Sequence, residues 1–272
     1  MQIRPMTEAD LAAADELRRL AGWNQTLEDW GLLLGLEPKG CFVAIEDNGV
    51  VGTVTTTAYG PELAWIGMML VHPERRRQGI GTRLMRTALD YLQGCGIACI
   101  RLDATPAGRP VYEKLGFVSE WNLTRHQGAA VAGRLLNTRE LVEADWPAVE
   151  KLDAAAFGVA RGHILRALAQ RSRATMVTPA EGPIIGFGML RRGSHCDYLG
   201  PAAGDGSLIC ALLENATGPV VWDVPDDNHQ ARALAEHLGF EQVRPLTRMR
   251  CGPDTVKSDP EAQLGIADPS LG

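Results

Sequence analysis

The sequence of 272 residues contains an internal repeat, and this repeat restricts the possible folds more than any other feature. Residues 3–11 (IRPMTEADL) return as residues 138–146 (TRELVEADW), and residues 111–117 (VYEKLGF) return as residues 234–240 (LAEHLGF). Self-similarity of this kind indicates one structural unit used twice. The chain is long enough for two domains of roughly 100 to 150 residues each. The sequence therefore predicts two copies of one fold in tandem.

Hydrophobic periodicity and turn signals predict the same order of elements in both copies. Thr7 and Thr26 are placed as helix N-caps, and residues 47–49 (DNG) are typical of a hairpin turn. In the first copy we expect strands at 2–6, 41–46, 49–58, 64–71 and 97–103, a last strand pair to about 127, and helices at 8–21, 25–35, 79–95 and 107–115. In the second copy we expect strands at 174–178, 183–191, 195–200 and 219–224, and helices at 145–156, 162–171, 205–215 and 228–238.

Small residues and a proline-rich end suggest where the domains begin and end. The glycine- and alanine-rich stretch 128–133 is the candidate linker, which gives domains at 1–130 and 134–251. Residues 252–272 contain three prolines and no aromatic residue, so we expect a disordered tail there. The fold class is α/β (α+β), with each domain a mixed sheet flanked by helices.

The stretch 71–82 (VHPERRRQGIGT) has the composition of a pyrophosphate-binding loop. It follows an apolar strand-like run and precedes an amphipathic helix with Leu84, Ala88 and Leu92 on one face. A helix N-terminus attracts phosphate through unpaired N–H groups and its partial positive charge. Arg75, together with the two arginines that follow it, adds charge at the mouth. A dinucleotide fingerprint would need a glycine where Leu84 stands, and a GKS/GKT phosphate loop is absent from the sequence.

Two motifs together resemble the GCN5-related N-acetyltransferase (GNAT) family. The run from Arg76 to Gly81, R-x-x-G-x-G, resembles the acyl-CoA loop of that family. About thirty residues later, residues 102–117 (LDATPAGRPVYEKLGF) resemble its fifth strand, the next helix and its Y-x-x-x-G-F ending. The resemblance implies two tandem GNAT folds, each with a mostly antiparallel twisted sheet flanked by helices.

The resemblance also implies site residues. Tyr112 would be the general acid that protonates the leaving thiolate. Backbone groups of the strand before the loop would pair with the pantetheine arm and supply an oxyanion donor. The implied acyl-CoA-binding residues are Met69, Leu70, Val71, Arg76, Arg77, Gln78, Gly79, Ile80, Gly81, Thr82, Thr105, Gly108 and Tyr112. Thr105 stands where family members commonly have asparagine.

The sequence alone does not identify the general base. Residues 64–71 contain no carboxylate, although family members often carry a glutamate there. Glu28, Glu62 and Asp103 are candidates, as is a chain of water molecules. For the acceptor, Arg109 and Arg125 could bind a carboxylate.

The second copy has the same order of predicted elements but lacks the residues expected for phosphate binding and proton transfer. Its counterpart of the arginine loop, residues 197–206 (DYLGPAAGDG), contains no cation and places Asp205 where a phosphate would lie. Ala235 stands in the place of Tyr112. We interpret this copy as a degenerate GNAT-like domain.

Composition excludes several partners. The net charge of −6 argues against general binding of nucleic acid or of an anionic membrane. The sequence lacks an apolar run of roughly 18 residues and a signal-peptide core, so we expect a cytoplasmic protein that does not bind membranes. Six scattered cysteines without zinc spacing indicate free thiols and no metal. A monomer or a homodimer fits equally well.

The expected function is transfer of an acetyl group from acetyl-CoA to the primary amine of a small amino-acid-like or polyamine-like molecule. Two alternatives remain open. The chain could bind acyl-CoA without catalysis as a regulatory protein, or it could acetylate a peptide, a protein or an aminoglycoside.

Overall fold

The computed structural model describes residues 1–47, 49–129 and 137–272, which form two compact units. Unit 1 comprises Met1–Ser119, Met249–Thr255 and Pro269–Leu271, and unit 2 comprises Glu120–Arg248, Val256–Asp268 and Gly272. Most of the predicted linker 128–133, and the central residue of the predicted 47–49 turn, lie outside the described residues.

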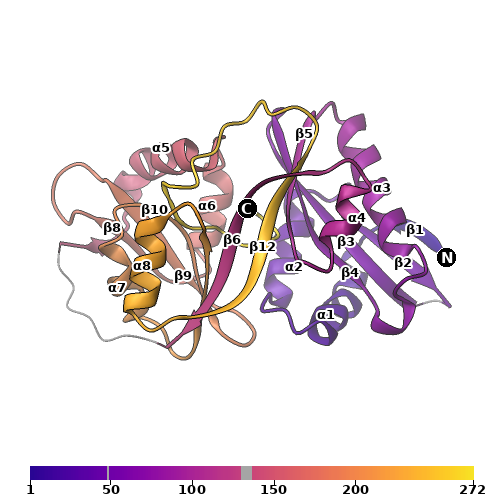
Figure 1. The fold of residues 1–272 in the computed structure, drawn as a ribbon, viewed down its shortest axis with the longest axis horizontal. Helices are drawn as coiled ribbons and strands as arrows, with labels where there is room; N and C mark the ends of the chain where they lie inside the picture. The colour runs from indigo at the N-terminus through magenta and orange to yellow at the C-terminus, as the bar shows by residue number, and fades with distance from the viewer. Residues whose placement is uncertain (48, 130–136) are drawn as a thin grey trace. The chain divides into compact units, whose positions relative to one another are not determined.

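Unit 1 is a mixed sheet with helices on both faces (Figure 1). Its strands lie in the order β1-β2-β3-β4-β5, antiparallel except for the parallel pair β4–β5. Its elements are β1 (Gln2–Pro5), η1 (Glu8–Asp10), α1 (Leu11–Leu20), α2 (Leu27–Leu36), β2 (Phe42–Glu46), β3 (Gly49–Tyr59), β4 (Leu63–Val71), η2 (Pro73–Arg75), α3 (Ile80–Gly94), β5 (Cys99–Ala104) and α4 (Arg109–Glu113). The expected α/β (α+β) class, a mixed and mostly antiparallel sheet flanked by helices, is thus observed.

The core of unit 1 lies between the sheet and helices α3 and α4. The apolar stripe of α3 packs on alternate residues of the strands, among them Val54, Ile66 and Leu102. Helices α1 and α2 pack against β3, and the side chains that alternate with Val54 point to their face. The sheet therefore separates an α3–α4 face from an α1–α2 face.

The repeated sequence motif forms the same ion pair in each unit. Arg4 binds both carboxylate oxygens of Asp10 at 2.8 and 2.7 Å, and Arg139 binds Asp145 at 2.6 and 2.7 Å. Each aspartate also accepts a backbone N–H three residues before it, at 2.8 Å. This contact ties the strand that begins each sequence repeat to the helical turn that follows it.

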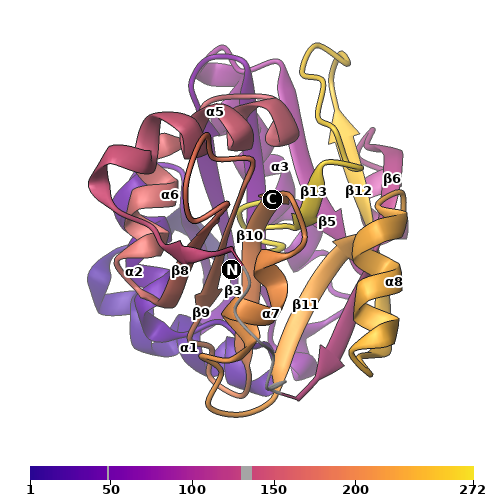
Figure 2. The ribbon, with the colours of Figure 1, turned by 90° about the vertical axis from the view of Figure 1, so that its left-hand side faces the viewer.

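Unit 2 repeats the arrangement with a much shorter counterpart of α3. Figure 2 shows α5 and α6 on one side of β9–β11 and α8 on the other. Its elements are β6 (Val118–Gly128, from Glu120 onward), β7 (Arg139–Glu140), η3 (Glu143–Asp145), α5 (Trp146–Phe157), α6 (Gly162–Ala169), β8 (Ser172–Thr178), β9 (Gly186–Arg191), β10 (Asp197–Gly204), α7 (Leu208–Leu213), β11 (Val220–Pro225), α8 (His229–His237), β12 (Glu241–Cys251) and β13 (Gln263–Gly265). The predicted strand pair before residue 127 is a single strand, β6.

The predicted disordered tail is wrong. Residues 263–265 form β13, and Leu264, Ile266 and Leu271 are buried. The segment lacks aromatic residues, but its backbone carbonyls accept hydrogen bonds from side chains of both units. Order here comes from contacts with distant residues, which the local composition does not reveal.

The units also differ from the predicted boundaries at 130 and 134. Residues 120–128 of β6 belong to unit 2, whereas the end of β12 belongs to unit 1. Met249 and Cys251 of β12 join the apolar core of unit 1 beside β5. Each unit is thus completed by a segment distant in sequence.

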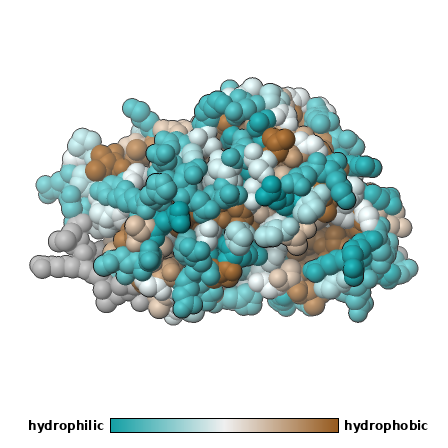
Figure 3. Space-filling view, in the orientation of Figure 1, coloured by the Kyte–Doolittle hydropathy of each residue, from teal (hydrophilic) through white to brown (hydrophobic). Residues whose placement is uncertain are grey.

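The face shown in Figure 3 is mostly hydrophilic, with scattered apolar residues. None of the helices in the described ranges combines the length and the apolarity that crossing a membrane requires.

Candidate functional site

Strands β4 and β5 of unit 1 run in parallel and then separate. They are paired from Leu63–Cys99 to Trp65–Arg101 and not beyond, although β4 continues to Val71. The β5-facing backbone groups of β4 beyond Trp65 are therefore not bonded to β5. The opening between these strands offers hydrogen-bonding groups to a bound molecule.

A β-bulge shapes β4 at this opening. Thr53 lies opposite Leu70 and Thr55 opposite Gly67, so Met68 and Met69 share a single partner on β3. Met68 has a positive φ of 46°, and its carbonyl oxygen accepts a 2.8 Å hydrogen bond from the hydroxyl of Thr53. The bulge turns the side chains of Met69 and Val71 toward helix α3, where they join the edge of the core.

The loop after β4 ends at the N-terminus of α3. Gly79 is the N-cap residue and has φ = 79°, a left-handed conformation that favours glycine. The N–H groups of Ile80, Gly81 and Thr82 occupy the first turn, where a helix offers no acceptor. Gly79 is exposed and Gly81 is half-buried. This helix end is open to solvent and suited to an anion.

Gly81 also has a packing role. A Cβ at this position would lie 3.3 Å from Cε of Met69 and 3.6 Å from Cγ2 of Val71. The glycine thus allows the first turn of α3 to approach the end of β4 closely.

The three arginines of the loop have different surroundings. Arg75 lies beside the carboxylates of Asp47 and Glu46, at 3.3 and 3.8 Å. Arg76 is exposed, and its Nε donates to the carbonyl oxygen of Val71 at 3.2 Å. Arg77 is exposed and has a positive φ of 61°. Two cations thus face solvent beside the helix end, while the charge of Arg75 is balanced locally.

Helix α4 presents Tyr112 at the end of β5. The ring is 8% exposed and lies 6.0 Å from that of Phe117, and burial raises the pKa of Tyr112 to about 12. A Cβ on Gly108 would lie 3.0 Å from this ring, so glycine allows the close packing. Thr105 accepts the N–H of Gly108 at 3.2 Å through its hydroxyl. A tyrosine with a raised pKa stays protonated near neutrality, as a general acid must.

The three candidate bases lie in different places. Glu28 is exposed in the first turn of α2, and Glu62 is exposed in the turn before β4. Glu62 precedes β4 and lies three residues before Trp65, where the pairing with β5 ends, so it lies outside the opening. Asp103 is half-buried on β5, between Leu102 and Ala104 of the α3-facing core, so it lies on the α1–α2 face. Of the three carboxylates, Asp103 alone lies on a strand that borders the opening.

The two predicted acceptor-binding arginines have other partners. Arg109 bonds Glu113 at 2.7 Å. Arg125 belongs to unit 2, where it forms a buried pair with Asp223 at 2.8 and 2.5 Å.

Comparison with known sequences decides the family. Residues 6–117 match the acetyltransferase (GNAT) family, and residues 149–265 match a second acetyltransferase (GNAT) domain. The chain belongs to the GNAT acetyltransferase family. It is a tandem GNAT protein and an acyl-CoA-dependent transferase.

Its relatives agree with this assignment. Holothin acyltransferase of Pseudoalteromonas sp. is 25% identical over 85% of this chain and 81% of its own length. An uncharacterised N-acetyltransferase of Bacillus subtilis, YitH, is 26% identical over 66% of this chain and 67% of its own. The solved structure of a candidate acetyltransferase from Pyrococcus horikoshii has a TM-score of 0.87 and 25% identity, covering 100% of this chain and 95% of that one.

The second GNAT domain contains the same strand separation, filled by its own chain. Strands β10 and β11 are paired in parallel from Asp197–Val220 to Leu199–Trp222 and then separate. Strand β13 pairs with β10 beyond that point, and Trp222 Nε1 donates to the carbonyl oxygen of Leu264 at 2.8 Å. On the other side, the N–H of Ile266 donates to Asp223 O at 3.2 Å. The opening of unit 2 is therefore occupied by β13.

The remaining features of the second GNAT domain fit this occupancy. The carboxylate of Asp205 accepts the N–H of Ser207 at 2.9 Å just before α7. Ala235 is fully buried on α8 where unit 1 carries Tyr112. The domain thus has neither an open helix end for an anion nor a phenolic acid at this place.

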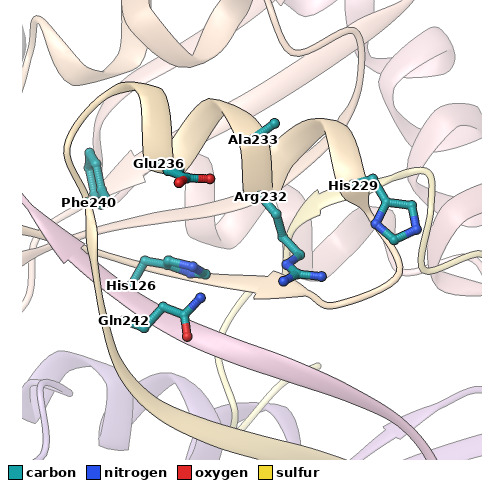
Figure 4. A pocket seen from close by; sticks show the side chains of 7 residues that line it. All are labelled: His126, His229, Arg232, Ala233, Glu236, Phe240 and Gln242. Atoms are coloured by element: carbon teal, nitrogen blue, oxygen red, sulfur yellow. The ribbon is translucent and has the colours of Figure 1, made fainter.

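A groove of about 500 Å³ lies beside α8 in this domain (Figure 4). His126 forms its floor with Nδ1 3.0 Å from the carbonyl oxygen of Thr124, and burial lowers the pKa of this imidazole. The rim carries the guanidinium of Arg232 and the carboxylate of Glu236, both on α8. The groove is lined by β6, α8 and the start of β12, outside the β10–β11 opening.

Two features of the site were not predicted from the sequence. The bulge at Met68 has no local signal, since a positive φ at methionine is unusual. The side of the sheet on which Asp103 lies could have been predicted from the sequence. Apolar residues stand at 100, 102 and 104, so in a strand Asp103 points to the opposite side.

Proposed function

We propose that unit 1 transfers the acetyl group of acetyl-CoA to a primary amine of a small molecule by direct attack. Three features found together support this proposal. Strands β4 and β5 separate after Trp65, the N-terminus of α3 is exposed beside two solvent-exposed arginines, and a buried tyrosine lies at the end of β5. In unit 2 the matching opening is filled by β13. The chain would have one catalytic site.

The residues of unit 1 fit the parts of acetyl-CoA. The pyrophosphate would accept the N–H groups of Ile80, Gly81 and Thr82, with Arg76 and Arg77 beside it. The amides of the pantetheine arm would pair with the β4 backbone from Met69 to Val71 as an added strand would. Thr105 and Gly108 would flank the arm from the α4 side.

The chemistry follows from these positions. The amine nitrogen attacks the thioester carbon, and a backbone N–H of β4 stabilises the oxyanion that forms. The carbon–sulfur bond then breaks, and the leaving thiolate takes the phenolic proton of Tyr112. The products are an N-acetyl amine, which keeps one N–H, and coenzyme A. The base takes one proton from the attacking neutral amine, and a proton then returns through solvent from the base to Tyr112, so both groups regain their starting states.

We propose Asp103 as that base, acting directly or through a water molecule. It lies on the α1–α2 face of β5, and the opposite face of the sheet is filled by the α3–α4 core. An acceptor would therefore reach the thioester from the side of Asp103. Glu28 is on a helix of that same face and remains a second candidate.

A small-molecule acceptor is the first class to examine. One relative is named for an individual compound, holothin, rather than for a protein acceptor. Peptide, protein and aminoglycoside amines are the alternatives within the same chemistry. A regulatory role without catalysis would leave the buried Tyr112 unused.

The test is a screen for coenzyme A release over amino acids, polyamines, aminoglycosides and peptides with free N-termini. We expect thiol release with one class of small amine, and loss of that release in the Gly81→Val variant. If the parent protein fails to bind acetyl-CoA in a calorimeter, the proposal is wrong. Binding without release for any amine would favour the regulatory alternative.

A further inference from the structure

A short segment near the end of the chain covers part of β4 in unit 1. Pro269–Leu271, here called the strap, belongs to that unit. The indole Nε1 of Trp65 donates to the carbonyl oxygen of Pro269 at 3.1 Å, and the hydroxyl of Tyr59 donates to that of Leu271 at 2.5 Å. Ser270 is 4% exposed. The strap is thus bonded at both ends to strands β3 and β4.

The strap touches β4 where the strand opening begins. A Cβ added to Gly67 would lie 2.7 Å from Cα of Ser270, a distance that real Cβ atoms do not show. Gly67 lies two residues beyond Trp65, the last residue of β4 that pairs with β5. It also directly precedes the bulge at Met68. Glycine at this position is therefore explained by the close approach of Ser270.

The face beneath the strap is polar. Thr55 and Thr57 of β3 lie opposite Gly67 and Trp65 in the sheet register, on the face away from α3. Both side chains are buried, and within the described ranges neither hydroxyl has a hydrogen-bond partner. Buried polar groups are nearly always paired with protein, water or a ligand. Because both oxygens are closed to solvent, the surface that an approaching molecule meets here is the strap itself.

We propose that the strap is a fixed wall of the acceptor site and that Ser270 limits the size of the acceptor. The inference rests on the proposed function, since it places the thioester in the β4–β5 opening. An acceptor approaching on the α1–α2 face would then pass Ser270. The site favours a compact primary amine.

The test compares acceptors of different length in variants that loosen the wall. The probes are primary amino alcohols from 2-aminoethanol to 6-aminohexanol, with kcat/KM measured for each. Gly67→Ala displaces Ser270, and Tyr59→Phe removes one anchor of the strap. Gly49→Ala is the matched control, because a Cβ there meets only the carbonyl oxygen of Glu46 at 3.6 Å.

We expect the ratio of kcat/KM for the longest and shortest amino alcohol to rise about fivefold in both variants, the effect of roughly one hydrogen bond. The dissociation constant of acetyl-CoA should stay near the parent value. An unchanged ratio in Tyr59→Phe, with acetyl-CoA binding retained, would overturn the proposal even if Gly67→Ala failed to fold.

An unchanged length ratio in a folded variant that still binds acetyl-CoA refutes the wall alone. Failure of the parent protein to bind acetyl-CoA refutes the proposed function instead.

Discussion

The indole Nε1 of Trp222 donates a hydrogen bond to the carbonyl oxygen of Leu264, 2.8 Å away, and this bond fixes β13 in the opening between β10 and β11. In unit 1, β4 and β5 separate in the same way after Trp65, and there the loop that follows carries exposed cations. The two GNAT domains thus have the same strand arrangement. Because β13 fills the opening of unit 2, we predict that a single acyl-CoA molecule binds per chain, in unit 1.

Replacing Tyr112 with phenylalanine should lower kcat by about 10² to 10⁴-fold, the usual contribution of a general acid. The affinity for acetyl-CoA should change little, because the ring and its packing against Phe117 remain. Steady-state kinetics with calorimetry would separate the two effects. Tyr91→Phe is the matched control, since the hydroxyl of Tyr91 is bonded to Glu37 at 2.7 Å.

The raised pKa of Tyr112, about 12, gives a separate expectation. The phenol stays protonated well above the ordinary tyrosine range, so kcat should not fall through its ionisation between pH 7 and pH 10. A fall in kcat with a midpoint near pH 8, lost in Tyr112→Phe, would contradict this assignment.

The loop arginines should contribute unequally to acyl-CoA affinity. Arg77→Gln should weaken acetyl-CoA binding about tenfold, as expected for loss of a charge-assisted contact with phosphate. Arg75→Gln should have less effect, because Arg75 already lies beside Asp47 and Glu46. Titrations at two salt concentrations would measure both. Equal losses in the two variants would show that the charge of the whole loop, rather than its geometry, binds the anion.

Asp103→Asn tests the proposed base. We expect kcat/KM for the amine to fall at least about tenfold, while acetyl-CoA affinity is retained. The acidic limb of the pH profile of kcat/KM should also change. Glu62→Gln serves as the control, because Glu62 lies at the other end of β4. Wild-type turnover in Asp103→Asn would leave Glu28 or a water chain as the base.

The repeated ion pair predicts a stability effect that depends on pH. The Arg4 guanidinium lowers the pKa of Asp10 from 3.8 to about 2, so the pair stabilises the fold above about pH 4. This contribution is lost as the pH falls toward 2, when the folded state must also take up the proton. Asp10→Asn should lower the free energy of unfolding by about 1 kcal/mol at pH 7, because Arg4 is partly exposed.

Urea denaturation from pH 7 to pH 2.5 would check this sign. The difference between the parent and Asp10→Asn should shrink as the pH falls. Asp145→Asn should show the same direction, since Arg139 lowers the pKa of Asp145 in the same way. A difference that grows in acid would contradict the interpretation of these ion pairs.

The frame of each domain could be predicted from the sequence because it depends on local signals. The repeated arginine and aspartate reappear as matching ion pairs, and the glycine at 79 reappears as a left-handed helix cap. Apolar periodicity likewise predicted α3 and its buried face. These features need only residues near one another in the chain.

Long-range contacts could not be predicted in this way. Residues 256–271 have a defined structure because their main-chain carbonyl groups accept hydrogen bonds from distant side chains. Every sequence has such carbonyl groups, so composition does not reveal these contacts. Trp222 and Trp65 supply donors from residues 42 and 204 positions away. No local sequence signal shows that β6 belongs to unit 2 from Glu120 onward or that the end of β12 belongs to unit 1. The position of Asp103 relative to the opening follows only once β4 and β5 are known to be paired.

The number of acetyl-CoA molecules bound per chain tests the central claim most directly. Isothermal titration of the parent protein should give one site. Gly81→Val should abolish it, because a Cβ there would already lie 3.3 Å from Cε of Met69 and the larger valine side chain must shift the first turn of α3 or the end of β4. Gly206→Val, in the corresponding loop of unit 2, should leave one site. Two sites in the parent, or one site that survives Gly81→Val and disappears in Gly206→Val, would contradict the account.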